Sequence, residues 1–312
     1  MPKISIIIPL YNEAESLPHL KETLDRILAR EKLDAELLFV NDGSTDSSRE
    51  QLDRFAESDP RVRVIMFRRN YGKSAAVDAG FRSALGEYVI TMDADLQDDP
   101  EEIPNLIAKL EEGYDLVSGW KKKRYDPLSK KIPSRIFNWS VRIFSGIRLH
   151  DFNCGLKIYR RQVLETIRVY GELHRFIPML VAAQGWRVGE LIVQHHPRRW
   201  GTTKFGISRF VGGMLDLMSV LFITRFKTQP MHLFGSFGLF SMLIGLVILL
   251  YLTISWFLGV PIGQRPLFFL GILLVIVGIQ FFSIGLIGEL ISHSNEMNQL
   301  QTGNKKQIEE PE

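Results

Sequence analysis

The sequence has very little cysteine and no strong excess of charge of one sign. Cys154 is its single cysteine, so no disulfide can form within the chain and a reducing compartment is expected. The formal net charge is +3, which does not by itself indicate nucleic-acid binding, and we expect no nucleic acid among the partners. No His and Cys cluster indicates a zinc site.

Charged residues are absent from two long segments near the C-terminus. No Asp, Glu, Lys or Arg occurs from 232 to 264 or from 266 to 288. A helix rises about 1.5 Å per residue, so either segment can cross a hydrocarbon core of about 30 Å. Both are apolar on every face, which argues against a buried helix pair in a soluble protein. We predict a hairpin of two transmembrane helices, at about 232–258 and 266–290.

Basic residues flank this hairpin on one side. Arg225 and Lys227 precede the first span, Lys305 and Lys306 follow the second, and the short connection between the spans contains a single Arg. The positive-inside rule therefore places both termini in the cytoplasm. We expect a multi-pass protein of the cell (inner) membrane, with a transmembrane region over 231–292 and a polar cytoplasmic tail over 293–312.

The N-terminal part of the chain alternates between strand-like and helical patterns. Short apolar runs predict strands at 5–9, 36–41, 62–67, 88–93 and 116–119. Helix-spaced apolar residues predict helices at 17–29, 47–56, 74–84 and 100–111. The alternation predicts an α/β fold with a mostly parallel sheet covered on both faces. Ligands of such sheets bind beyond the carboxyl ends of the strands.

Acidic segments follow three of these strands. They read "PLYNEAE" after the first strand, "NDGSTDS" after the second and "DADLQDD" after the fourth. One acidic turn is most often a solvated cap, but three at one edge indicate a site. The carboxylates of Asp93 and Asp95 can converge on one cation because Ala94 leaves the space open, and Gln97 can add a neutral oxygen. Such ligands suit Mg²⁺ or Mn²⁺.

Longer motifs make this interpretation more specific. "PLYNEAESL", "VNDGSTDSS", "RRNYGKSAAVDAGF" and "DADLQDDPEEI" occur in the order and at the spacings of family 2 glycosyltransferases. Together with "DFNCGLKIYRR" and the predicted hairpin, they make the chain similar to the dolichol-phosphate mannosyltransferase and polyprenyl-phosphate glucosyltransferase group. The resemblance implies a cytoplasmic catalytic domain over 1–204 with the GT-A fold, a Rossmann-like nucleotide-diphospho-sugar transferase fold.

The resemblance also implies an activity. It is inverting transfer of a hexose from a nucleotide-diphosphate sugar, of the UDP-glucose or GDP-mannose type, to an undecaprenyl or dolichyl phosphate. Relatives form tetramers, so a homo-oligomer is expected. The residues that the resemblance places around the nucleotide sugar are Pro9, Tyr11, Asn12, Glu13, Asp42, Arg69, Lys73, Asp93, Ala94, Asp95 and Gln97. Among them, Asp93, Asp95 and Gln97 are the expected metal ligands.

Lys73 supports an anion site independently of the resemblance. It opens a predicted helix, and the helix dipole favours anions rather than cations at that end. A lysine there is explained if an anion binds beside it. The alternative is an ordinary solvated lysine.

Two basic segments are expected to serve the acceptor. The first contains Arg124 and continues into a basic amphipathic helix within about 120–149, and the second contains Arg199 and Lys204. A phosphate monoester is largely ionised at neutral pH, so it needs charge compensation more than a general base. We interpret the helix as lying in the membrane interface, the alternative being a helix packed on the domain with a solvated basic face. Residues 205–230 are expected to form a second interfacial helix and linker, or else a third buried or re-entrant span.

The sequence leaves open the roles of several residues in the "DFNCG" segment and in the region that follows it. Asp151 is a candidate base or a group that orients the donor sugar or an arginine. Cys154 is not expected to be a nucleophile, because no activating His pair is evident. His195 and His196 are further candidates, although a His pair after a strand is more often structural. The residues expected to serve catalysis are thus Asp95, Asp151, Arg124, Arg199 and Lys204.

Two other functions fit parts of the sequence. A processive membrane polysaccharide synthase normally carries Q-x-x-R-W, whereas four residues separate Gln194 from Arg199 here. A non-catalytic sugar-nucleotide-binding membrane protein usually lacks metal ligands of the kind that this sequence retains.

Overall fold

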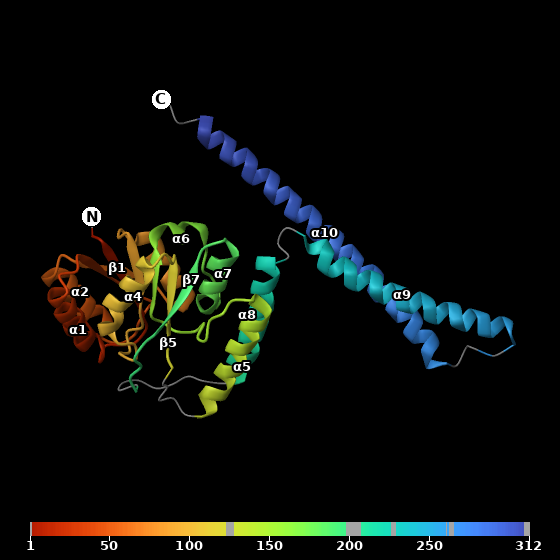
Figure 1. Cartoon of the computed structure of the whole chain (residues 1–312), viewed down its shortest axis with the longest axis horizontal. Coiled ribbons are helices and arrows are strands. Elements are labelled where there is room, and N and C mark those ends of the chain that lie inside the picture. The colour runs from red at the N-terminus through yellow and green to blue at the C-terminus, as the bar shows by residue number, and fades with distance from the viewer. Residues whose placement is uncertain are drawn as a thin grey trace. The chain divides into compact units, whose positions relative to one another are not determined.

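The computed structural model divides into two compact units, Met1–Leu221 and Phe222–Glu312 (Figure 1). It describes residues 2–122, 128–197, 207–225, 229–259, 261 and 265–308. The boundary between the units falls inside a helix, α8 (Ile207–Arg225).

A seven-stranded sheet forms the centre of the first unit, in the order β3-β2-β1-β4-β6-β5-β7. The strands are β1 (Ile4–Leu10), β2 (Ala35–Asn41), β3 (Val62–Met66), β4 (Tyr88–Thr91), β5 (Leu116–Trp120), β6 (Lys157–Arg160) and β7 (Val188–Ile192). Only β6 pairs antiparallel with its neighbours among the described strands, and all other neighbouring pairs are parallel. The predicted strands are therefore confirmed, and β6 and β7 are additions that the sequence analysis did not predict.

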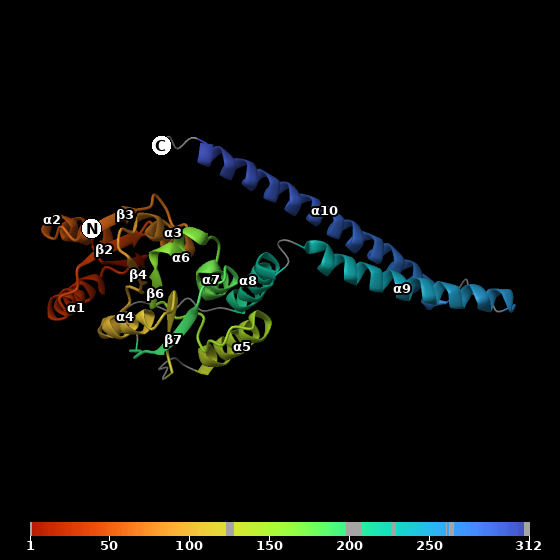
Figure 2. The same ribbon diagram turned by 45° about the horizontal axis from the view of Figure 1, so that its top comes forward.

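Helices cover both faces of this sheet (Figure 2). Before the sixth strand they are α1 (Leu17–Arg30), α2 (Ser48–Ser58), α3 (Lys73–Ser83), the 3-10 turn η1 (Pro100–Glu102), α4 (Ile103–Glu111) and α5 (Leu128–Ser145). After it come α6 (Arg161–Thr166), η2 (Leu173–Phe176), α7 (Ile177–Ala183) and α8. Because successive side chains of a strand point to opposite faces, Ile6 joins the core under α1 and α4, whereas Ile7 joins the core under α3.

The register of the strands brings the acidic segments to one edge of the sheet. β1 ends with Leu10 beside Asn41, the last residue of β2. β4 ends level with Ile7, so the residues after Thr91 lie level with the end of β1. β6 runs the other way and begins at this same edge, with Lys157 opposite Thr91. The start of β6 and the ends of the parallel strands therefore form one rim.

Helices α5 and α8 pack on the first unit and leave apolar side chains outside. Phe137 and Val141 of α5 share a buried core with Leu217 and Val220 of α8. The exposed large apolar side chains of the two helices are Ile136, Trp139, Ile143 and Phe144 in α5, and Leu215 and Met218 in α8. The amphipathic helix predicted from the sequence thus packs on the domain by one face, and its other face is not purely polar.

Two long helices, α9 (Pro230–Phe257) and α10 (Pro266–Ile308), form the second unit. Over Pro230–Phe257 and Pro266–Ser294 they are long and apolar enough to cross a membrane. Glycines line the contact between them: a Cβ on Gly238 would lie 2.7 Å from the carbonyl oxygen of Gly278, and one on Gly278 would lie 2.7 Å from that of Gly238. Most large apolar side chains, such as Phe240 and Leu246, are exposed instead. α10 continues to Ile308, through part of the predicted tail.

Candidate active site

The loops that follow β1 and β2 are bound to each other at the rim. Asn12 has a positive φ of 57°, and its side-chain oxygen accepts a 2.8 Å hydrogen bond from the backbone N–H of Thr45. The backbone N–H of Asn12 donates to the hydroxyl of Ser44, and that of Glu13 donates to the hydroxyl of Ser48. The predicted nucleotide-binding segment around Asn12 and Glu13 therefore has a fixed backbone before any ligand arrives.

Asp42 connects this region to the loop that leads into α3. Its buried carboxylate accepts hydrogen bonds from the backbone N–H of Tyr71 at 2.7 Å and of Gly72 at 2.9 Å. Gly43, with φ of +70°, faces the backbone of Arg69 so closely that a Cβ would lie 2.4 Å from its carbonyl carbon. Asp42 thus shapes the loop that contains Arg69, whose guanidinium lies 4.6 Å from the ring centre of Tyr71. The expected position of Asp42 around the nucleotide sugar stays a prediction.

Asp93 lies between a lysine and a glycine. The ammonium of Lys73 forms an ion pair with one carboxylate oxygen. On the other side, a Cβ on Gly155 would lie 2.6 Å from the second carboxylate oxygen, so only glycine leaves that oxygen its space. Burial alone would raise the pKa of Asp93, but the positive charges of Lys73 and Lys121 outweigh burial and lower it to about 2. The carboxylate is therefore ionised at neutral pH.

Asp95 and Gln97 belong to the tight turn that follows. Asp95 is buried, its carboxylate accepts a hydrogen bond from the backbone N–H of Gln97, and Leu96 between them has a positive φ of 56°. Two carboxylates and an amide oxygen within five residues are a donor set suited to Mg²⁺ or Mn²⁺, which also take water and phosphate oxygens. No group of three His, Cys, Asp or Glu side chains that could hold a metal is found within the described residues. A bound ion would therefore depend on the amide and on ligands from outside the chain.

The segment after β7 binds the far side of the same turn. The backbone N–H of His196 and Nδ1 of His195 both donate to the carbonyl oxygen of Gln97, at 2.9 and 3.1 Å. Nε2 of His196 lies 2.9 Å from a carboxylate oxygen of Asp99. The two histidines thus hold the turn in place, in agreement with the structural role that is usual for such a pair.

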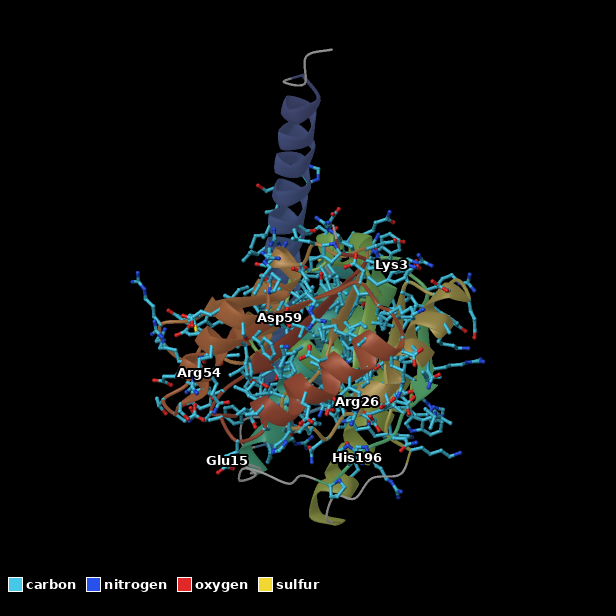
Figure 3. All side chains as sticks on the ribbon, turned by 90° about the vertical axis from the view of Figure 1, so that its left-hand side faces the viewer. Lys3, Glu15, Arg26, Arg54, Asp59 and His196 are labelled. Carbon is cyan, nitrogen blue, oxygen red and sulfur yellow. The ribbon has the colours of Figure 1, made fainter. Side chains whose placement is uncertain are left out.

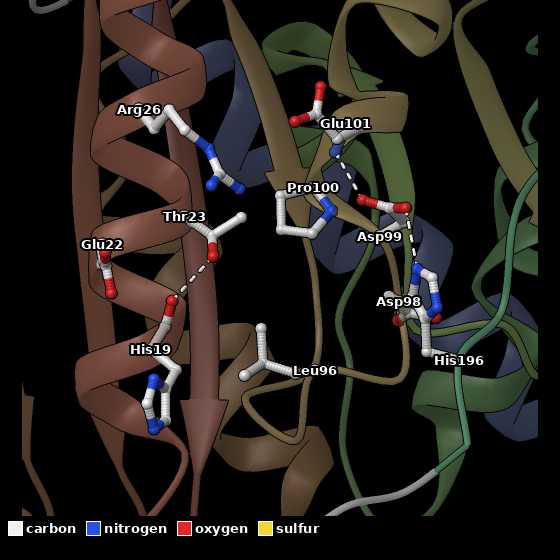
Figure 4. A pocket seen from close by; sticks show the side chains of 10 residues that line it. All are labelled: His19, Glu22, Thr23, Arg26, Leu96, Asp98, Asp99, Pro100, Glu101 and His196. Atoms are coloured by element: carbon white, nitrogen blue, oxygen red, sulfur yellow. Dashed lines mark hydrogen bonds and ion pairs between the residues drawn. The ribbon is translucent and has the colours of Figure 1, made fainter.

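A cavity of about 440 Å³ lies behind this turn, toward α1 (Figure 4). Its lining residues are His19, Glu22, Thr23, Arg26, Leu96, Asp98, Asp99, Pro100, Glu101 and His196. Figure 4 shows Asp99 between His196 and the backbone N–H of Glu101, which it caps. No residue of the predicted nucleotide-sugar site lines this cavity, so it is separate from that site.

Two further lysines lie beside the acidic turn, Lys121 partly buried and Lys157 buried. Lys121, which the sequence analysis grouped with the basic acceptor segment, lies 2.7 Å from the buried carboxylate of Asp98. Lys157 donates to the carbonyl oxygen of Cys154, and burial lowers its pKa despite the nearby charges of Asp151 and Asp93. Lys73 acts on Lys157 as well, so the structure brings Lys73, Asp93 and Asp151 into one neighbourhood. The rim is a group of paired charges rather than a bare acidic patch.

Comparison with known proteins identifies this arrangement. The family described as "Glycosyl transferase family 2" matches residues 5–168, more than half of the chain. The chain belongs to glycosyltransferase family 2. It is 39% identical over 298 residues to a dodecaprenyl-phosphate galacturonate synthase of Rhizobium johnstonii, covering 94% of this chain and 88% of the relative. It is 35% identical over 292 residues to an undecaprenyl-phosphate 4-deoxy-4-formamido-L-arabinose transferase of Klebsiella pneumoniae, covering 93% and 88%.

Solved structures of low identity share the fold of this glycosyltransferase. Glucosyl-3-phosphoglycerate synthase of Mycobacterium tuberculosis, in complex with Mn²⁺ and UDP-glucose, matches with a TM-score of 0.54 at 18% identity, over 72% of this chain and 79% of that one. Its complex with Mg²⁺ and UDP matches with a TM-score of 0.55 at 18% identity, over the same shares. The predicted fold class, a GT-A-like domain followed by two apolar helices, is confirmed.

Three residues expected to serve the acceptor of the glycosyltransferase, Arg124, Arg199 and Lys204, lie outside the described residues. Asp151 is described and is almost fully buried, with its carboxylate accepting a hydrogen bond from the backbone N–H of Asn153. Burial raises the pKa of Cys154 to about 12, so its thiol is protonated, in line with the expectation that it is no nucleophile.

Sequence reasoning missed Lys157 and His174 at this site. His174 contacts Ser74, the second residue of α3. The hydroxyl oxygen of Ser74 lies 2.9 Å from Nδ1 of the His174 ring. Burial, together with the positive charges of Lys73 and Arg175, lowers the pKa of His174 well below its usual value. No local pattern marks His174, because its partner lies 100 positions away. Lys157 carried a weak signal at most, as a lysine between the apolar residues Leu156 and Ile158.

Proposed function

We propose that this glycosyltransferase transfers a hexose or related sugar from a nucleotide-diphosphate donor to a polyprenyl phosphate at the cytoplasmic face of the cell membrane. The observation that carries the proposal is the charged rim, where Asp93 pairs with Lys73 and the same turn contains Asp95 and Gln97. The chain is similar over nine-tenths of its length to two polyprenyl-phosphate sugar transferases. Those relatives handle galacturonate and a formamido-arabinose, so UDP-glucose and GDP-mannose are only two of the donors to test.

The donor diphosphate is proposed to lie at the rim, against Asp93, Asp95, Gln97 and Lys73. Asp93, Asp95 and Gln97 would hold Mg²⁺ or Mn²⁺, which when bound supplies charge neutralisation for the departing diphosphate. The fixed backbone of Asn12 and Glu13 and the loop shaped by Asp42 support the nucleotide side of the proposed site. Preorganisation of this kind lowers the cost of ordering a flexible loop around a ligand.

The acceptor phosphate is proposed to attack the anomeric carbon as an anion, so that one C–O bond forms as the bond to the nucleoside diphosphate breaks. Inversion follows from this single displacement. An ionised phosphate needs no strong base, but its approach to a second anion needs positive charge. Lys157 is one buried lysine in this neighbourhood, and Arg124, Arg199 and Lys204 are the further candidates.

Membrane attachment is proposed to place the acceptor within reach. The apolar spans in α9 and α10 would cross the bilayer, and the exposed apolar faces of α5 and α8 would lie in its interface. Trp139 and Phe144 on α5 are the kind of side chain that prefers this depth. By resemblance we also propose a homo-oligomer, a tetramer, which native mass spectrometry of the purified protein tests.

A donor panel tests the proposal. Purified protein in nanodiscs is incubated with undecaprenyl phosphate, Mg²⁺ or Mn²⁺, and each of several radiolabelled UDP- and GDP-sugars, and the label in the organic phase is counted. We expect one donor class to give labelled lipid, and excess chelator to stop the transfer. Label in a water-soluble polymer would instead support a polysaccharide synthase, and no transfer from any donor would support a sugar-nucleotide-binding protein.

The variant Asp95→Asn provides the matched test of the rim. Transfer should fall by at least about 1,000-fold, because a metal that stabilises the leaving group contributes several kcal/mol and each ~1.4 kcal/mol is tenfold in rate. Asp53→Asn, at an exposed position on α2, should transfer at the wild-type rate. Equal activity of Asp95→Asn and wild type would remove Asp95 from the site.

A further inference from the structure

The carboxylate of Asp93 already forms an ion pair with a cation of the chain itself. The ammonium of Lys73 is in direct contact with this carboxylate, although the two residues come from different elements, the start of α3 and the turn after β4. The side chains are 36% and 30% exposed, so a small ligand can reach both from solvent. The contact is therefore a partly exposed ion pair at the expected metal site.

The backbone around Lys73 holds its ammonium in this position. Gly72, with φ of +93°, and Tyr71 are both bound to the carboxylate of Asp42, which fixes the loop before the helix. The helix dipole makes a cation in the first turn of a helix unfavourable. The negative charge of Asp93 offsets this unfavourable interaction for Lys73. Gly155 meanwhile leaves the second oxygen of Asp93 unobstructed by a side chain.

Electrostatics makes this ion pair a competitor for the metal. A divalent ion that binds Asp93 must displace the ammonium or remain next to it, and both options cost free energy. A diphosphate changes the balance, because its oxygens can accept the ammonium while they also ligate the ion. Metal and diphosphate would then each increase the affinity of the other, by the same factor.

We propose that Lys73 is a placeholder cation, which occupies Asp93 in the donor-free protein, opposes binding of a divalent ion alone, and moves to the diphosphate when the donor arrives. This inference rests on the proposed function, since it takes Asp93 as a metal ligand and a nucleoside diphosphate as the ligand of the rim. Its consequence is that the enzyme does not hold its metal until the donor is present.

Binding of Mn²⁺ to the full-length protein in detergent tests the inference without any transfer reaction. Free Mn²⁺ is measured by electron paramagnetic resonance, first without nucleotide and then with saturating UDP or GDP, after correction for the Mn²⁺–nucleotide complex in solution. In the wild type we expect either nucleotide that binds to increase Mn²⁺ affinity by about tenfold or more, within the usual range for coupled sites.

Lys73→Met should bind Mn²⁺ alone about tenfold more tightly than the wild type, and the effect of nucleotide should shrink correspondingly. Lys73→Arg, which keeps the charge, should bind Mn²⁺ alone as weakly as the wild type. Lys109→Met removes a lysine that pairs with Glu112 on the surface of α4 and should change nothing. Thermal melting of each variant verifies that it is folded.

The outcomes separate this inference from the proposed function. If Lys73→Met binds Mn²⁺ alone no more tightly than the wild type, the placeholder role is wrong while the metal site stands. If the wild type binds no Mn²⁺ with either nucleotide, the metal assignment fails and the placeholder role fails with it.

Discussion

Glycines serve different purposes in the two units of this protein. In the first unit, Gly155 leaves room for the charged carboxylate of Asp93. In the second unit, Gly238 and Gly278 leave room for the backbone of a neighbouring apolar helix. The first unit has charged side chains over its outside, such as Arg26 of α1 and Arg54 of α2 in Figure 3, whereas the second has large apolar side chains there.

This difference reflects the surroundings that each unit is built for. In water, burial of large apolar side chains drives folding, so the first unit packs most of them around its sheet, and at its rim Lys73 pairs with Asp93 and Lys121 with Asp98. In lipid, apolar side chains gain little by turning inward, and helices associate through close contact of small residues. A glycine in the first unit is therefore expected to matter for the reaction, and a glycine in the second for stability.

Among the substitutions that test this comparison of the two units, Gly155→Ala should have the largest effect. The added Cβ would meet the carboxylate of Asp93 at 2.6 Å and displace it, and misplacement of a site group by about 1 Å can cost about 100-fold in rate. Transfer should therefore fall about 100-fold, while thermal melting changes little because a side chain can move aside. Gly212→Ala, in open space on α8, should leave transfer unchanged. If Gly155→Ala instead lost much stability and kept its transfer rate, this glycine would matter for stability rather than for the reaction.

Gly278→Ala should show the opposite pattern. Its Cβ would lie 2.7 Å from the carbonyl oxygen of Gly238 and 2.8 Å from the backbone nitrogen of Met242, atoms that cannot move without separating the helices. We expect the free energy of unfolding to fall by about 1–3 kcal/mol, measured by denaturation in detergent. Val247→Leu adds bulk at an exposed position of α9 and should have no effect. An unchanged unfolding free energy for Gly278→Ala would show that the hairpin does not depend on this contact.

The smallest effect that we expect is on the pH dependence of stability. It tests whether the first unit loses stability in acid because His174 is held neutral. The pKa of His174 is lowered in the folded protein, so below about pH 6.5 the unfolded chain binds a proton that the folded one does not. Stability should therefore be fully present above pH 6.5 and decline as the pH falls. The melting temperature of the wild type should decrease more between pH 7.5 and pH 5.5 than that of His174→Gln. Parallel curves would show that His174 is not held neutral.

Much of the first unit could be predicted because its pattern is local. The strands β1 to β5 and the helices between them follow from apolar spacing. β6 was not predicted, because it has only four residues and one of them is the buried Lys157. Its antiparallel direction depends on the sheet as a whole rather than on its own residues.

The candidate site was predicted less completely, because partners cannot be read from single residues. The motifs located Asp93, Asp95 and Gln97 together in one turn. They did not show that Lys73 contacts Asp93, or that Lys121 pairs with Asp98 instead of remaining in the basic acceptor segment. Such pairings arise only when the strands bring distant parts of the chain to one edge.

The reversed direction of β6 has a mechanical consequence. Because β6 begins where its neighbours end, the chain arrives at the rim from α5, and only five residues lie between Ser145, the end of that helix, and Asp151. Any shift of α5 along its axis is therefore passed through a short tether to Asp151 and Gly155. If α5 lies in the membrane interface as proposed, its movement would change the space that Gly155 leaves beside Asp93.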